Sequence, residues 1–225
     1  MTGSVAWKAI TFDCYGTLVD WEAGIVAAFK TAAKKQGIPL DAPQIIAAYH
    51  EAEPAVQAGP YRTYREVLGH VAVAVAERLG WTLEPGQAGF LADSLKSWPV
   101  FSDSRPALER LRSRYQVAIL SNVDDDLLAG TIERIGVEFD WTVTAQQVKS
   151  YKPATHHFLE AIRRVDGDRT SLLHAAQSLF HDLQPARQLG LSAVWVNRKG
   201  EALTAEAKPL HTVADLTELA DWLGL

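Results

Sequence analysis

The sequence of 225 residues contains a single cysteine, Cys14, and no run of about 18 apolar residues that could cross a membrane. A single cysteine excludes a disulfide bond within the chain and is typical of a reducing compartment. The sequence does not open with a basic segment followed by an apolar one, so no signal peptide is indicated. We therefore expect a cytoplasmic protein that is not bound to a membrane.

Positive charge is also scarce. The sequence has 22 Lys and Arg against 27 Asp and Glu, a formal net charge of -5, and no basic block. Nucleic acid is not an expected partner, because binding to phosphates requires clustered Lys and Arg. The hydrophobic content of 48% is ample for a core. This length suits one domain with a sizeable insertion, or two small domains.

The pattern of elements changes at Pro99. Before it, apolar periodicity and Gly or Pro stops predict consecutive helices, over 22–36, 41–58, 61–79 and 85–96. After it, short apolar runs alternate with helical segments. The expected strands are 117–120, 141–144, 171–174 and 193–196, and the expected helices include 103–114 and 216–223. Such an alternation predicts a parallel, doubly wound sheet.

An apolar run over 5–12, rich in β-branched residues, ends on Asp13, and Gly16 permits a tight turn soon after. Ligands of open α/β sheets bind at the carboxyl ends of the strands. A carboxylate at that place can act as a nucleophile. Asp13 could equally cap a turn or a helix. These residues alone leave both interpretations open.

The segment from Asp13 to Leu18, DCYGTL, resembles the first motif of the haloacid dehalogenase (HAD) superfamily, DxxxT, whose Asp is the nucleophile. Phosphatases of the superfamily carry a second Asp two residues later, which protonates the leaving alcohol. The dehalogenase branch has Tyr there, because a halide leaves without a proton, and this chain has Tyr15. The sequence therefore resembles the L-2-haloacid dehalogenase (type II) branch. The resemblance implies an α/β fold, with a HAD-like doubly wound parallel sheet (a Rossmann-like core) over 1–19 and 99–225 and an inserted all-helical cap domain over 20–98.

Two further segments resemble motifs of this superfamily. Ser121 and Asn122 follow the strand predicted at 117–120, where a hydroxyl and an amide can donate to a bound anion. The acidic residues 124–126 that follow are better explained as the N-cap and dipole partners of a helix. Lys152 resembles the third motif, and Pro153 is expected to begin a helix. An ammonium group near two carboxylates keeps both ionised.

The fourth motif departs from that of the phosphatases, which place two acids here to complete a Mg²⁺ site. This chain has Ser178 in place of the first acid and keeps only Asp182. A hard divalent cation requires several carboxylate oxygens, so we expect neither a metal nor another cofactor. Asp182 is then expected to orient or deprotonate a water molecule. His181 is an alternative base, although neighbouring residues on a loop usually point apart.

The resemblance implies a mechanism in which Asp13 displaces the leaving group and water guided by Asp182 hydrolyses the resulting ester. Thr17 would position Asp13, and Tyr15 would pack on the substrate or its leaving group. The substrate would be a small carboxylate, held by Ser121, Asn122 and Lys152. The family often forms dimers, so a homodimer is possible.

The cap departs from the branch. The branch clamps the substrate carboxylate with an Arg in the early cap helices, but this sequence has no Lys or Arg between Lys35 and Arg62. Arg62 and Arg65 could substitute from the next helix. Glu53 shares a helical face with apolar residues and is expected to point inward. It could pair with one of these arginines, or face the active site and select a substrate that carries an amine.

Four functions remain open from the sequence. The first is a 2-haloacid dehalogenase with a rearranged carboxylate clamp. The second is a related hydrolase of another small carboxylate, for which azetidine-2-carboxylate hydrolase is an example. A non-catalytic protein of the same fold is disfavoured because Asp13, Lys152 and Asp182 are all present. A phosphatase is disfavoured by Tyr15 and Ser178.

Overall fold

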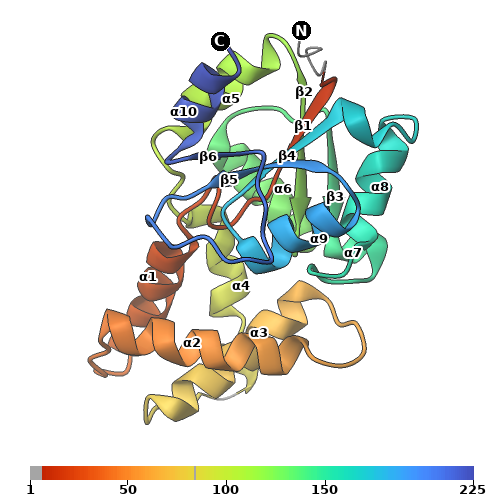
Figure 1. Ribbon diagram of the computed structural model, residues 1–225. Helices are drawn as coiled ribbons and strands as arrows, with labels where there is room; N and C mark the ends of the chain where they lie inside the picture. The colour runs from red at the N-terminus through yellow and green to blue at the C-terminus, as the bar shows by residue number, and fades with distance from the viewer. Residues whose placement is uncertain (1–6, 84) are drawn as a thin grey trace, which may run out of the picture.

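The computed structural model describes residues 7–83 and 85–225. Their strands form a parallel six-stranded sheet in the order β3-β2-β1-β4-β5-β6 (Figure 1). The strands are β1 (Ala9–Phe12), β2 (Gln116–Ser121), β3 (Trp141–Thr144), β4 (Leu172–Ala176), β5 (Ser192–Val196) and β6 (His211–Val213). This confirms the predicted α/β fold and its strands, of which residues 5 and 6 lie outside the described part of the chain. Strand β6 was not predicted, because only Val213 of its three residues is buried.

Helices connect these strands. They are α1 (Trp21–Lys34), α2 (Ala42–Gln57), α3 (Tyr64–Arg78), α4 (Phe90–Ser94), α5 (Ser104–Arg112), α6 (Asp125–Ile135), α7 (Ala145–Val148), α8 (His156–Arg164), α9 (Gln184–Gln188) and α10 (Leu216–Trp222). The single helix predicted over 85–96 is wrong. It is divided into α4 and two 3₁₀ turns. Gly86 and Gly89 disfavour a continuous helix there, since glycine loses most backbone freedom in one.

Alternate residues of the strands face two separate apolar layers. Ile10 and Phe12 of β1 pack in the larger cluster, which also contains buried residues of α5, α6 and α10. Ala9 packs in a second cluster with residues of α8 and α9. This division follows from the period of two in a strand. It leaves both faces of the sheet covered, as a parallel sheet requires.

Helices α1 to α4 lie together beyond the carboxyl end of β1 (Figure 1). Their buried side chains belong to the same large cluster as those of the sheet. Gly24 of α1 permits this packing, because a Cβ atom there would lie 2.3 Å from the ring of Trp98. The limits 20–98 for the cap and 1–19 with 99–225 for the core stay a prediction. No helix of the described residues is long and apolar enough to cross a membrane.

Candidate active site

A cavity of about 250 Å³ lies where the carboxyl ends of three strands meet the helices α2 and α3. Asp13 follows β1, Ser121 ends β2, and Asp182 lies in the π-helical turn after β4. Strand β1 lies between β2 and β4, where the order of the strands reverses. Open α/β sheets bind their ligands at such a switch point.

The loop after β1 holds Asp13 in one position. Gly16 adopts a φ of +102°, a conformation that favours glycine, in the turn that follows β1. Thr17 donates from Oγ1 to Asp13 Oδ2 at 3.0 Å and accepts from the backbone N–H of Gln177, also at 3.0 Å. Arg198 donates twice to the backbone oxygen of Thr17, at 3.0 and 2.7 Å, and pairs with Asp103. The carboxylate of Asp13 is therefore oriented before any substrate arrives.

Lys152 joins the two carboxylates of the site. Its Nζ donates to Asp13 Oδ1 at 2.8 Å, to Asp182 Oδ1 at 2.7 Å and to the backbone oxygen of Leu120 at 2.9 Å. An ammonium group has three N–H donors, and all of them are used here. The expectation that Lys152 also holds the substrate carboxylate does not fit this arrangement. Lys152 instead orients both acids.

Burial and charge act in opposite directions on this trio. Burial raises the pKa of Asp13, and Lys152 and Thr17 only partly offset it. Burial acts on Asp182 in the same sense, but Lys152 and His174 outweigh it and hold its pKa well below the usual range. Burial would lower the pKa of Lys152, but the two carboxylates raise it instead. The ammonium group therefore stays charged, with Asp182 ionised beside it.

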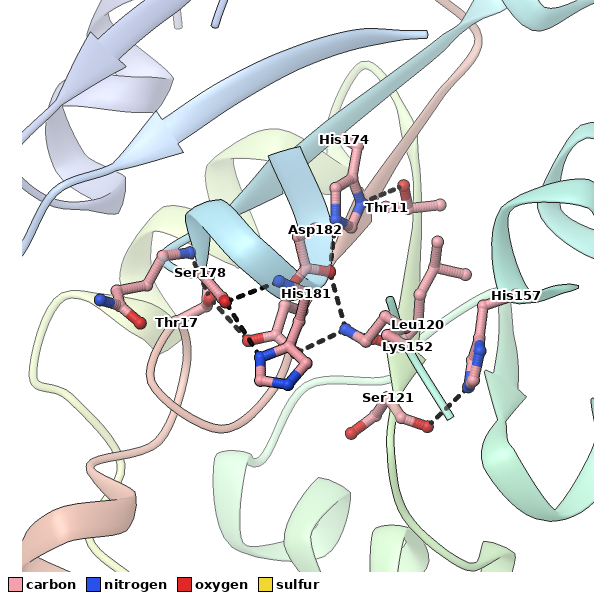
Figure 2. Close-up of polar contacts among 12 residues, drawn as sticks. Thr11, Thr17, Leu120, Ser121, Lys152, His157, His174, Ser178, His181 and Asp182 are labelled. Carbon is pink, nitrogen blue, oxygen red and sulfur yellow. Dashed lines mark hydrogen bonds and ion pairs between the residues drawn. The ribbon is translucent and has the colours of Figure 1, made fainter. Parts of the chain in front are cut away.

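Only one of the two carboxylate oxygens of Asp182 accepts hydrogen bonds from described residues. His174 donates from Nε2 to Oδ1 at 3.0 Å, and its other nitrogen lies 2.9 Å from Thr11 Oγ1 (Figure 2). Oδ2 is buried and has no hydrogen-bond partner among the described residues. His181 also lines the cavity, with Nδ1 3.1 Å from Ser178 Oγ. His181 and Asp182 therefore both belong to the lining of the cavity, although they are neighbours in sequence.

The two residues of the second motif, Ser121 and Asn122, differ in whether their side chains are free to bind a ligand. Ser121 is buried, and its Oγ has no partner among the described residues. His157, whose pKa burial lowers to about 3, donates to the backbone oxygen of Ser121 at 3.2 Å. The Asn122 amide is bonded both ways to the backbone of Lys152, at 3.1 and 2.7 Å. Asn122 thus holds the Lys152 loop, and Ser121 is the free donor.

Tyr15 forms part of the wall between the sheet and the cap. Its hydroxyl donates to Thr131 Oγ1 at 2.9 Å, since Thr131 itself donates to the backbone oxygen of Leu127. Its ring meets the ring of Trp98 edge-on, with centroids 5.5 Å apart. Tyr15 and Trp98 both line the cavity. The aromatic ring of Tyr15, rather than its hydroxyl, is therefore what a ligand meets.

Neither arginine proposed as a carboxylate clamp lies at the cavity, so this prediction is corrected. Arg65 forms exposed ion pairs with Asp93 at 2.9 Å and Asp126 at 2.8 Å. Arg62 is exposed and donates to the backbone oxygen of Val56 at 3.2 Å. Both guanidinium groups are thus bound to other partners, and neither arginine lines the cavity.

Asp124 occupies the N-cap position of α6, as expected, but its side chain makes no cap hydrogen bond there. Its carboxylate accepts from the backbone N–H groups of Tyr64 at 2.9 Å and Arg65 at 2.8 Å, so it caps α3. This contact ties the cap helix to the end of β2, and sequence spacing cannot show it because 60 residues separate Asp124 from Tyr64. The helix expected to begin at Pro153 begins at His156 instead, after a turn.

Glu53 lines the cavity from α2, together with aromatic side chains that the sequence did not single out. Its partners are not arginines. Tyr49 and Tyr64 donate from their hydroxyls to Glu53 Oε1 at 2.9 and 3.0 Å, and Gln57 donates to the same oxygen at 3.3 Å. Burial raises the pKa of Glu53, and the two phenols lower it. Of the two alternatives left open by the sequence, the structure brings Glu53 to the cavity.

The donor set does not fit a divalent cation. Lys152 Nζ lies between Asp13 and Asp182, and Ser178 supplies a hydroxyl that caps the turn Leu179–Leu183. Among the described residues, no group of three His, Cys, Asp or Glu side chains could hold a metal ion. Too few carboxylate oxygens remain for a hard cation.

The parallel sheet, the aspartate fixed at its switch point and the helical layer above it define an α/β enzyme site of the type expected from the sequence. A family model of haloacid dehalogenase-like hydrolases matches residues 7–190. The chain belongs to this family.

Three known proteins show the extent of the similarity. The (S)-2-haloacid dehalogenase H-109 of Pseudomonas putida is 26% identical over 220 residues, covering 96% of this chain and 97% of that protein. A defluorinating L-2-haloacid dehalogenase, Rha0230, superposes with a TM-score of 0.85 at 22% identity, over 97% of this chain and 96% of the other. The L-2-haloacid dehalogenase of Xanthobacter autotrophicus with chloropropionic acid covalently bound superposes with a TM-score of 0.79 at 19% identity, over 97% and 98%.

Proposed function

We propose that the protein hydrolyses the carbon–halide bond of a small 2-haloacid, through an ester of Asp13 and without a metal ion. The observation that carries this proposal is the fixed carboxylate of Asp13, bound by Lys152 and Thr17 at the floor of the cavity. The relatives of this chain include (S)-2-haloacid dehalogenases that match 96% and 94% of its length. A covalent chloropropionic acid complex of a protein with the same fold is consistent with an ester intermediate.

The proposed reaction has two steps. Asp13 attacks the carbon bearing the halogen, a C–O bond forms, and the halide leaves with the electron pair of the broken bond. Water then attacks the ester carbonyl of Asp13, transferring its proton to Asp182 Oδ2, which has no partner among the described residues. The products are a 2-hydroxy acid, a halide ion and a proton. His181 is the alternative base, because it also faces the cavity.

A second candidate is the hydrolysis of another small carboxylate, such as azetidine-2-carboxylate, by the same steps. It is favoured by the charges around the cavity. Lys152 is its single lining ammonium or guanidinium group among the described residues, and no N–H of Lys152 is free for a substrate carboxylate. A cytoplasmic location and a homodimer stay predictions.

Halide release tests the proposal. The wild-type protein should release halide from one enantiomer of 2-chloropropionate and form an equal amount of 2-hydroxypropionate. The variant Asp13→Asn should lose at least about a thousandfold in kcat while keeping its circular dichroism spectrum. Phosphate release from p-nitrophenyl phosphate, with no halide release from either enantiomer, would support a phosphatase instead.

A further inference from the structure

The cap end of the cavity presents the carboxylate of Glu53, which forms no ion pair with any side chain that the structure describes. All of the hydrogen bonds that Glu53 receives from described side chains reach Oε1, from Tyr49, Tyr64 and Gln57. No described side chain donates to Oε2. Glu53 is partly exposed, and it lines the same cavity as Asp13. One oxygen is therefore fixed by the protein and the other is available to a ligand.

The charges around the cavity favour a cation. Among the described residues, three carboxylates line it, those of Asp13, Glu53 and Asp182, against one ammonium group, that of Lys152. That ammonium group already binds Asp13 and Asp182, so the charge of Glu53 is met only by hydrogen bonds from neutral side chains. A partly buried carboxylate without a cationic partner is costly. A ligand whose only charge is negative would increase this cost, and an ammonium group would remove it.

The walls and the far end of the cavity fit a ligand of two opposite charges. The aromatic rings of Trp21, Tyr49, Tyr64 and Trp98 line it, and aromatic faces attract cations. At the sheet end, Ser121 is 1% exposed and its Oγ has no partner among the described residues. A hydroxyl in that position can donate to a carboxylate.

We propose that Glu53 binds a positively charged nitrogen of the substrate, so that the substrate is a small carboxylate carrying an ammonium group beside its reactive carbon. This inference rests on the proposed function only in taking the same cavity as the substrate site. A 2-haloacid with an amino group and a strained cyclic amino acid both belong to this class. A bound ammonium group also keeps Glu53 ionised, against the effect of burial.

Binding of two inert ligands of the same ring size tests the assignment without any turnover. L-Proline carries an ammonium nitrogen and a carboxylate, and cyclopentanecarboxylate carries the carboxylate alone. Measured by calorimetry at pH 7.5, L-proline should bind the wild-type protein at least about tenfold more tightly. In Glu53→Gln this ratio should fall to near one. The control is Glu51→Gln, an exposed carboxylate of the same helix, which should leave the ratio unchanged.

Equal affinities in the wild-type protein, tighter binding of cyclopentanecarboxylate, or no binding of either ligand would overturn the inference. An unchanged ratio in folded Glu53→Gln would do the same, and would mean that Glu53 only joins α2 to α3. If Glu53→Gln does not fold, Glu53→Asp keeps the charge but withdraws it by one methylene, and it should weaken L-proline alone. If the wild-type protein releases no halide but still binds L-proline more tightly than cyclopentanecarboxylate, the proposed function is contradicted and this inference stands.

Discussion

The two ends of the cavity are built on different principles. At the sheet end, Lys152 binds both Asp13 and Asp182 through buried hydrogen bonds, which fix the two carboxylates relative to its ammonium group. At the cap end, Glu53 is held by two phenols and an amide, and no described side chain forms an ion pair with it. The sheet end therefore arranges the reacting groups regardless of the substrate. The cap end leaves one charge for the substrate to satisfy, and this is where we place selectivity.

The largest effect is expected from removing the ammonium group at the sheet end. Lys152→Met leaves two buried carboxylates facing each other, so it should cost roughly 3–5 kcal/mol in the free energy of unfolding at neutral pH, and turnover should be lost. Urea denaturation and halide release measure both effects. Lys149→Met is the matched control, since Lys149 is exposed and lies over the ring of Tyr61. A variant at 152 as stable as this control would mean that the trio contributes no electrostatic stability.

A smaller effect, which depends on pH, is expected at Asp182. Its pKa is held below the ordinary value of 3.8, so the ionised form stabilises the folded state above that value and this contribution is lost as the pH falls below it. The difference in unfolding free energy between the wild-type protein and Asp182→Asn should therefore shrink as the pH is lowered from about 6 to about 3, across the ordinary pKa of 3.8. Urea titrations at each pH measure it. A difference that does not vary with pH would contradict the assignment of charge in the trio.

Little effect is expected from the cap arginines. Arg65 is exposed and paired with Asp93 and Asp126, so Arg65→Gln should cost less than about 1 kcal/mol and leave KM for 2-chloropropionate within about twofold. Arg62→Gln should behave in the same way. A rise in KM of about tenfold or more would show that an arginine reaches the substrate and would restore the clamp.

No effect at all is expected from removing divalent cations. The site offers two carboxylates already bound to Lys152 and a serine in place of a third acid. Dialysis against EDTA should leave the rate of halide release unchanged, and added Mg²⁺ should not raise it. A rate that disappears with EDTA and returns with Mg²⁺ would contradict the proposed mechanism.

The sheet end was the more predictable of the two from sequence. Asp13 and Ser121 follow short apolar runs, and parallel strands bring their carboxyl ends together, so spacing places these two residues near each other. Lys152 follows no such run, and only its resemblance to the third motif of the family placed it at the site. Spacing could not predict that all three N–H groups of Lys152 bind protein oxygens. It also could not predict that the side-chain amide of Asn122 binds the backbone of Lys152. Both depend on side-chain geometry.

The cap end was predictable only in part. Helical periodicity placed Glu53 on the inner face of α2, and the structure has it there. Its partners depend on how α2 packs against α3, a contact between helices that no local pattern determines. Arg62 and Arg65 were misplaced for the same reason, because Asp93 and Asp126 attract Arg65 from distant segments. The prediction of a single helix over 85–96 was wrong for a local reason, because Gly86 and Gly89 disfavour a continuous helix there.

The ester on Asp13 is the central claim, and one isotope experiment tests it directly. A single turnover in ¹⁸O-water, with enzyme in excess of 2-chloropropionate, should place ¹⁸O in the carboxylate of Asp13 and leave the hydroxyl of the product unlabelled. This result is expected because water attacks the ester carbonyl and the product takes its oxygen from Asp13. Mass spectrometry of the peptide containing Asp13 and of the product measures both. Label found in the product, with Asp13 unlabelled, would mean that water attacks the substrate itself.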